Sequence, residues 1–339
     1  MKKIPVREAV GHVLCHDMTQ IIPGTYKGPR FRKGHIVTAE DIPVLLSMGK
    51  EHLFVWEKGE GMLHEDEAAT RLAALCRNEY MEASPAREGK IELRAAADGF
   101  FTVASDRLQA VNTVEDVMIA TRHGNTPVRA GDKLCGTRCI PLVIPEETIR
   151  AAEQAAGSEP LMAIHPYRLR RAAVITTGSE VFHGRVEDAF TPVLVQKLAS
   201  YGIEMIAHRT VDDDKAHIME AIDAMRCTDA EMILCTGGMS VDPDDNTPGA
   251  IRDCGARIVT YGAPVLPGAM FLLGYFEDST PVMGLPGCVM YAKATVFDLV
   301  LPRIAAGIAV ERSDFVKMGE GGLCLGCGEC RYPVCPFGK

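Results

Sequence analysis

The stretch that decides the fold is residues 172–180, which read AAVITTGSE. Its apolar half is short enough for a buried strand and passes directly into a glycine-containing turn. Two later stretches have the same form: 232–238, MILCTGG, and 281–287, PVMGLPG. Helical patterns lie between and after them, at 191–200, at 214–225, at 247–254 and at 288–306. Short apolar strands alternating with helices predict an α/β fold, a parallel sheet flanked by helices.

Outside these alternating strands and helices the pattern of apolar, glycine and proline residues is different. We place the α/β domain at 169–312, preceded over 1–168 by a β-rich α+β region and followed over 313–339 by a cysteine-rich tail. The amino-terminal region is punctuated by glycine and proline, and helices are predicted within it at 39–48, 63–80 and 145–156.

Bulk composition excludes several classes of function. The 339 residues carry 36 Lys and Arg against 45 Asp and Glu, a net charge of −9. An acidic protein has no general attraction for phosphate backbones, so we expect no nucleic-acid partner. The amino terminus lacks the apolar stretch of a signal peptide, and no run of about 18 apolar residues occurs. We therefore expect a cytoplasmic protein without a membrane span.

Glycine and small polar residues follow each of the three predicted strands. Because the carboxyl ends of parallel strands meet at one edge of a sheet, these loops are predicted to converge there. Glycine lets backbone N–H groups approach an anion closely, although each glycine alone could equally be turn chemistry. Neither a P-loop nor a dinucleotide-binding glycine motif is present. The predicted anion-binding residues are Thr177, Gly178, Ser179, Gly237, Gly238, Ser240, Pro286 and Gly287.

Carboxylates stand beside these glycines, at Glu180, at 212–214, and at Asp242, Asp244 and Asp245. Carboxylates next to an anion repel it unless a cation lies between them, and Mg²⁺ does this with one or two carboxylates plus ligand phosphates. The alternative for Asp212 and Asp213 is helix capping or solvation.

The ordered set of motifs, TTGSE at 176–180, VDD at 211–213, TGGMSV at 236–241 with Asp245, and GLPG at 284–287, resembles the molybdopterin-binding domain. That domain is shared by the molybdopterin molybdenumtransferases and the molybdopterin adenylyltransferases. The resemblance implies a sheet that binds the phosphate of molybdopterin, or of its adenylylated form. It also implies that Thr177, Gly178, Gly237, Gly238 and Ser240 line the phosphate site. Asp213 is a further cofactor-binding residue, and Glu180, Asp214 and Asp245 are candidate catalytic positions near molybdate and Mg²⁺.

Two functions are compatible with this resemblance. One is a molybdenumtransferase-like enzyme that inserts molybdate with Mg²⁺ assistance, which Glu180 and Asp245 favour. The other is a carrier that delivers the cofactor to a client molybdoenzyme. It is favoured by Ala269 and Cys288, which stand where the family often has lysine and asparagine. Family members often form homodimers, so a homodimer is expected.

The chain has twelve cysteines, of which four lie in the tail and eight are scattered in apolar contexts. The scattered ones are interpreted as reduced core residues. The tail spacing is C-x₂-C-x₂-C-x₄-C-P, which predicts a metal site: a [4Fe–4S] cluster, whose bacterial ferredoxin spacing is one residue shorter in the last gap, or a four-thiolate Zn²⁺ site. A loose tail or a redox-active pair is the alternative. The four residues are Cys324, Cys327, Cys330 and Cys335.

Overall fold

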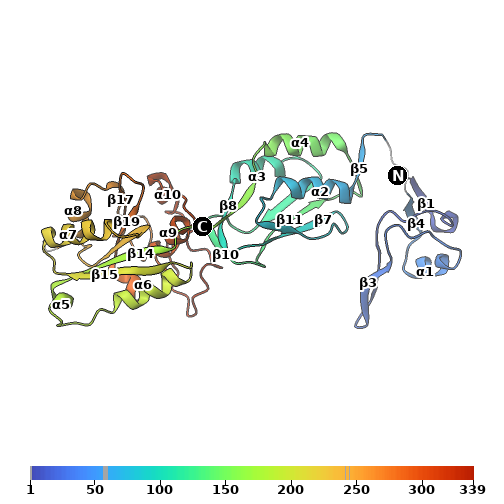
Figure 1. Ribbon diagram of the computed structural model, residues 1–339. Helices are drawn as coiled ribbons and strands as arrows, with labels where there is room; N and C mark the ends of the chain where they lie inside the picture. The colour runs from blue at the N-terminus through green and yellow to red at the C-terminus, as the bar shows by residue number, and fades with distance from the viewer. Residues whose placement is uncertain (1, 56–59, 241, 244) are drawn as a thin grey trace. The chain divides into compact units, whose positions relative to one another are not determined.

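The computed structural model describes residues 2–55, 60–240, 242–243 and 245–339 (Figure 1). The chain divides into two compact units. The amino-terminal unit comprises residues up to 96 with 103–122 and 130–163, and the carboxy-terminal unit comprises 97–102, 123–129 and 164–339. Chain order alone therefore does not separate the units, because two short segments before residue 164 fold with the carboxy-terminal one.

The central sheet of the carboxy-terminal unit has the order β15-β14-β16-β19-β18-β17. Strands β15, β14, β16 and β19 run parallel, and β18 runs antiparallel to both of its neighbours. The α/β class is confirmed. The bounds are β14 Arg171–Thr177, β15 Glu204–Val211, β16 Met232–Thr236, β17 Arg257–Tyr261, β18 Leu272–Tyr275 and β19 Pro281–Leu285.

One side of the sheet is antiparallel. Strands β17 and β18 were not predicted, and they add an antiparallel pair beyond β19. The connection from β18 to β19 is only residues 276–280. A parallel crossover needs a dozen or more residues, so a link this short forces the two strands to run in opposite directions.

Helices cover both faces of this sheet. Helices α6 (Phe190–Ala199) and α9 (Val296–Ala305) pack on one face, and α7 (Lys215–Arg226) and α8 (Thr247–Asp253) pack on the other. Strand β14 serves both cores, because Ala172 and Val174 face α6 and α9 while Ala173 and Ile175 face α7 and α8. Burial on both faces explains its nearly continuous apolar sequence.

The helix predicted at 288–306 is shorter in the structure. Residues Gly287–Met290 form the 3₁₀ turn η2, and α9 begins only at Val296. Thr295 sets this start, because its side chain accepts from the backbone of the first turn while Asp298 reaches back to the Thr295 N–H at 2.8 Å. This reciprocal capping box fixes a helix start more strongly than apolar periodicity does. The remaining helices of the sheet region are α5 (Ser179–Phe182) and α10 (Arg312–Lys317).

The amino-terminal unit contains a sheet of order β6-β7-β11-β9, formed by Met81–Ala83, Lys90–Ala95, Lys133–Cys139 and Val117–Thr121. Helices α2 (Glu65–Leu75) and α4 (Glu146–Ala156) confirm two predicted helices, and α3 (Ser105–Asn112) was not predicted. Strands β5 (Met62–His64) and β12 (Val143–Pro145) pair beside them, so α2 starts later than expected.

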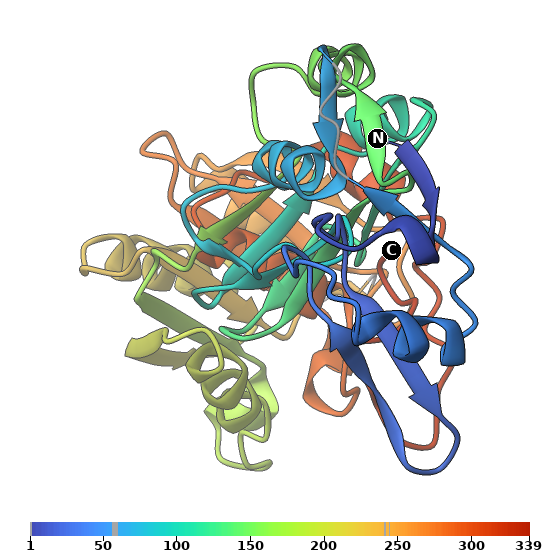
Figure 2. The same cartoon turned by 90° about the vertical axis from the view of Figure 1, so that its right-hand side faces the viewer.

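Residues 2–55 form a small assembly with its own apolar core. Strand β1 (Lys2–Pro5) pairs with β4 (His52–Val55), η1 covers Val6–Glu8, and α1 (Asp41–Ser47) confirms the helix predicted there. Strands β2 (Met18–Ile22) and β3 (Tyr26–Phe31) form a hairpin that extends from this assembly as a two-stranded ribbon (Figure 2).

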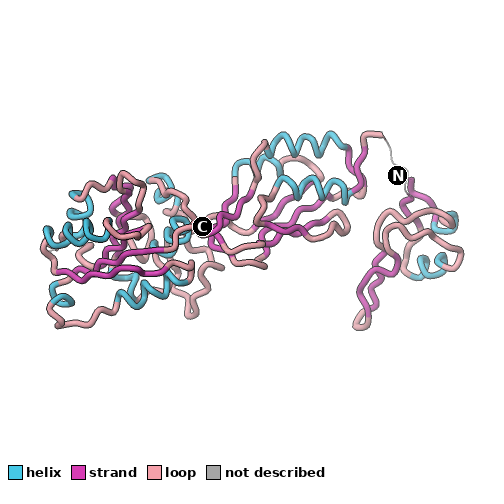
Figure 3. Tube along the Cα trace, in the orientation of Figure 1, coloured by secondary structure: helices cyan, strands magenta, loops and turns pink. Residues whose placement is uncertain are grey.

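Strands β8 (Gly99–Val103), β10 (Thr126–Val128) and β13 (Met162–Pro166) form a further small sheet of order β10-β8-β13. After α10 the chain contains no helix or strand, and residues 318–339 are drawn as loop throughout (Figure 3). In the part of the chain that is described, no helix has the length and apolar character needed to cross a bilayer.

Candidate ligand site at the carboxyl edge of the sheet

The loop after β14 is tied to the loop after the neighbouring strand β15. The Gly178 N–H donates to the carbonyl of Val211 at 3.2 Å, and the Ser179 N–H donates to Oδ2 of Asp213 at 2.8 Å. Gly178 has a φ of +142° and directly precedes α5. These contacts bring together two of the regions that the sequence placed at one edge.

The loop after β16 packs directly against the end of β14. A β-carbon added to Gly237 would lie 2.2 Å from the Thr177 carbonyl oxygen, and one added to Gly238 would lie 2.7 Å from the Thr247 hydroxyl. The Thr177 hydroxyl donates to the Thr236 carbonyl at 3.0 Å. Both glycines have positive φ, +82° and +55°, so this close approach requires glycine both for space and for backbone conformation.

The end of β19 joins this edge through Gly284 rather than through Gly287. A β-carbon on Gly284 would lie 2.4 Å from Sδ of Met239, so the β16 loop also packs on β19. Gly287 is exposed and has no atom within 4 Å of its would-be β-carbon, while Pro286 is buried. Of the predicted binding residues, Gly287 thus lies at the expected strand end with no atom near its would-be β-carbon, and Pro286 directly precedes it.

Four of the predicted acidic positions accept hydrogen bonds within the protein: Asp212, Asp213, Asp214 and Asp245. The Asp213 carboxylate holds the Ser179 N–H, and the Asp214 carboxylate caps α7 by accepting from the Ala216 N–H at 2.8 Å. Asp214 therefore has a capping role, the alternative that its position before a helix suggests. The Glu180 carboxylate folds back over Gly178, with Oε1 3.0 Å from the position that a β-carbon would take.

Asp245 closes the turn after Ser240. Its Oδ2 accepts from the Asp242 N–H at 3.0 Å. The Tyr261 hydroxyl donates to the carbonyls of Met239 and Ser240 at 3.0 and 3.1 Å and thereby anchors this loop to β17. Burial, and secondarily the charge of Asp245, raises the pKa of Tyr261, so its hydroxyl keeps its proton. Asp244 and Val241 lie outside the described residues.

A polar cluster beside this edge was missed by the sequence analysis. The Thr176 hydroxyl lies 3.0 Å from both Oδ2 of Asp188 and Nε2 of His208, and the Thr191 hydroxyl donates to the same Asp188 oxygen at 2.6 Å. Burial alone would raise the pKa of Asp188, but the hydrogen bonds from Thr191, Phe190 and Thr176 outweigh it and lower the pKa. The signal was available, because successive strand residues face opposite sides and Thr176 must point away from Thr177.

Within the described ranges, no group of three or more His, Cys, Asp or Glu side chains lies close enough to hold a metal ion. The edge instead presents carboxylates singly, at Glu180, Asp213 and Asp245.

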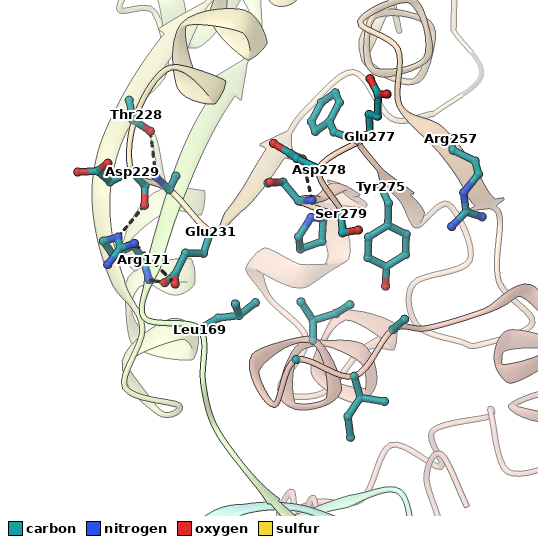
Figure 4. A pocket seen from close by; sticks show the side chains of 18 of the residues that line it. Leu169, Arg171, Thr228, Asp229, Glu231, Arg257, Tyr275, Glu277, Asp278 and Ser279 are labelled. Carbon is teal, nitrogen blue, oxygen red and sulfur yellow. Dashed lines mark hydrogen bonds and ion pairs between the residues drawn. The ribbon is translucent and has the colours of Figure 1, made fainter.

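A pocket of about 790 Å³ lies at the opposite edge of the same sheet (Figure 4). It is lined by residues at the amino ends of the parallel strands, among them Arg171, Glu231 and Pro281. Its polar groups are engaged with one another, since Glu231 accepts from the Arg170 and Arg171 N–H groups and Arg171 donates to the Asp229 carbonyl. Ligands of open α/β sheets bind at the carboxyl ends, so we place the candidate site at the glycine loops.

The four tail cysteines are free thiols. Cys327 and Cys330 are exposed, and Cys324 and Cys335 are half-buried. Of the scattered cysteines, Cys15, Cys76, Cys135, Cys139 and Cys235 are buried as expected, whereas Cys227 is exposed.

The fold and these loops define a three-layer α/β domain whose glycine-rich turns gather at one edge. The family model described as "Probable molybdopterin binding domain" matches residues 173–306, and this segment is a domain of the molybdopterin-binding family. Residues 3–57 match a model described only as a domain of unknown function. The first match contains every motif on which the resemblance was based.

Curated relatives share part of this domain. A CinA-like protein of Mycobacterium avium is 35% identical over 91 residues, 26% of this chain and 21% of the relative. A CinA-like protein of Desulfosudis oleivorans is 36% identical over 80 residues, 24% of this chain and 19% of the relative. The chain thus spans about a fifth of the length of these relatives.

Solved structures align over the same region. The molybdopterin biosynthesis enzyme MoaB of Thermus thermophilus is 23% identical with a TM-score of 0.36, covering 41% of this chain and 98% of that one. The tungsten cofactor synthesizing protein MoaB of Pyrococcus furiosus is 20% identical with a TM-score of 0.32, covering 36% and 84%. We base the domain assignment on the family model.

Proposed function

We propose that the carboxyl edge of the sheet binds molybdopterin, or adenylylated molybdopterin, and that the protein acts in molybdenum-cofactor biosynthesis. The observation that carries this proposal is the direct packing of the β16 glycines on the end of β14, with Gly237 too close to the Thr177 carbonyl for any side chain. Backbone amides brought together in this way, with no side chain in front of them, suit a phosphate group.

The binding roles proposed for the chain follow from its geometry. The amides of Gly237 and Gly238 offer donors, and Gly178 lies beside them with its own N–H bonded to the Val211 carbonyl. The Thr177 and Ser240 hydroxyls lie in the same loops, and the Thr177 hydroxyl donates to the Thr236 carbonyl. Asp213 positions the β14 loop through the Ser179 N–H. Mg²⁺, when bound, supplies positive charge between the ligand phosphate and the carboxylates of Glu180 and Asp245.

For the reaction we favour a molybdenumtransferase-like activity, with molybdate as substrate. Glu180 and Asp245 are the residues assigned to it, because neither carboxylate caps a helix, whereas Asp214 does. The second candidate is a carrier that delivers the cofactor to a client molybdoenzyme. Cys288 favours the carrier, since this half-buried thiol stands next to the carboxyl edge of the sheet, where family members often have asparagine. Burial raises the pKa of the Cys288 thiol.

The test is titration of the full chain with molybdopterin, followed by cofactor formation from molybdate and Mg²⁺. Glu180→Ala and Asp245→Ala are compared with Glu277→Ala, an exposed acid at the opposite edge. We expect the two site variants to retain binding and lose cofactor formation by at least tenfold. Unchanged formation in both would favour the carrier, and absence of molybdopterin binding by the unsubstituted chain would overturn the site. The expected homodimer is tested separately by sedimentation equilibrium.

A further inference from the structure

The cysteine tail is a closed loop fixed to the carboxy-terminal unit. At its base the Gly338 N–H donates to the Gly321 carbonyl at 2.9 Å. Leu266 holds the first residues of the loop, since its N–H donates to the Gly322 carbonyl and its carbonyl accepts from the Cys324 N–H, both at 2.8 Å. The segment is therefore folded, in contrast to the loose tail that the sequence left open.

Aromatic residues anchor the far side of the same loop. Phe337 is buried in the core that contains α9, and the Tyr332 hydroxyl donates to the Asp298 carbonyl at 2.7 Å. Tyr332 lies within the Cys330–Cys335 gap, and Phe337 follows directly after the Cys-Pro pair. Backbone hydrogen bonds and aromatic side chains thus hold the loop, and Cys324 and Cys335 also pack against the same core.

All four tail cysteines border one cavity of about 310 Å³. That is roughly ten times the 30 Å³ that one water occupies, so the space suits a group larger than a single ion. Its other walls are mostly apolar, with two cationic residues among them: Pro267, Leu323, Leu325, Phe337, Lys293 and Arg331.

The two candidate metal groups need different amounts of space between the thiolates, and the size of the cavity bears on the choice. Four thiolates on one Zn²⁺ lie roughly 3.8 Å apart, the edge of a tetrahedron with 2.3 Å Zn–S bonds. A [4Fe–4S] cluster instead binds each thiolate at a different iron, so its ligands surround a larger space.

We propose that Cys324, Cys327, Cys330 and Cys335 hold a [4Fe–4S] cluster in this cavity. Each thiol loses its proton as its sulfur binds an iron. The resulting cluster is anionic, and Lys293 and Arg331 at the rim offset its charge, while the apolar walls shield it from water. Core packing does not explain Cys327 and Cys330, because both are exposed, whereas a cysteine with a packing role would be buried.

The experiment uses the full chain, purified without oxygen and reconstituted with sulfide and equal amounts of ferrous and ferric iron. Cys327→Ala and Cys330→Ala are compared with Cys227→Ala, an exposed cysteine outside the tail. We expect about four irons and four sulfides per unsubstituted chain, with charge-transfer absorption in the visible. We expect these contents to fall at least severalfold in the two tail variants and to stay unchanged in Cys227→Ala.

Circular dichroism distinguishes ligand loss from misfolding, because Cys327 and Cys330 have no core contacts and their variants should keep the unsubstituted spectrum. Binding of one zinc per chain without sulfide would overturn the cluster, as would iron retained in both tail variants or lost equally in Cys227→Ala. Molybdopterin titration of the same samples is independent of this result.

Discussion

Replacing Gly237 by alanine is the most direct test of how the edge is built. The new β-carbon would stand 2.2 Å from the Thr177 carbonyl oxygen and 2.7 Å from its hydroxyl, at a backbone φ of +82°. The left-handed backbone costs roughly 1–2 kcal/mol for an L-residue. Overpacking against a strand end adds roughly 1–3 kcal/mol. We therefore expect Gly237→Ala to lower the free energy of unfolding by about 2–5 kcal/mol.

Gly287→Ala is the matched control. Gly287 lies at the end of the adjacent strand with no atom within 4 Å of the added carbon, so its alanine variant should stay within about 0.5 kcal/mol of the unsubstituted chain. The free energy of unfolding of each variant is measured by urea denaturation, monitored by far-ultraviolet circular dichroism. The folded samples are then titrated with molybdopterin. Residual folded Gly237→Ala should bind at least tenfold more weakly, about 1.4 kcal/mol. Equal stabilities of the two variants would refute the packing on which the site depends.

Two further predictions concern buried charges. Glu65 is nearly buried at the start of α2, and burial together with the charge of Asp66 raises its pKa from 4.5 to about 7. The stabilisation from its proton is complete below about pH 4.5 and is lost as the pH rises through about 7. Glu65→Gln should therefore have the same free energy of unfolding as the unsubstituted chain near pH 4.5. Near pH 8 it should be more stable by at most roughly 3 kcal/mol, measured by urea denaturation. An equal difference at both pH values would contradict the raised pKa of Glu65. Lys197 pairs with Asp298 at 2.5 Å, with side chains 14% and 12% exposed. Lys197→Met leaves that carboxylate buried and should cost about 3–5 kcal/mol, much of which Lys197→Met with Asp298→Asn should restore; no cost in the single variant would show the pair to be solvated.

Much of the α/β domain was predictable because its information is local. The runs at 172–175 and 232–235 are apolar and short, and both are buried strands. The helices predicted at 191–200 and 214–225 follow from the periodicity of their apolar residues. In contrast, the strands at 257–261 and 272–275 carry weak patterns, and their antiparallel pairing depends on a short loop.

The convergence of the glycine loops after β14 and β16 was predicted, but their contacts were not. Strand topology alone brought Gly178 and Gly237 to one edge, since parallel strands end together. The sequence alone could not show that Asp214 caps α7 and does not contact the ligand, because both roles need a carboxylate at the start of a helix. Nor could it find the Thr176, Asp188 and His208 cluster, whose members lie up to 32 residues apart.

The order of motifs along the chain determined the class of domain and the edge at which its ligand site is proposed. The spacing of the four cysteines in the tail also indicated a metal site without any knowledge of the fold. Only the tertiary structure decided that Gly237 touches Thr177, that Gly287 stands apart, and that the tail is pinned by Tyr332 and Phe337 with all its thiols on one cavity. The reason is physical: periodicity records which side of an element is buried, whereas the distance between remote residues is set by how those elements pack.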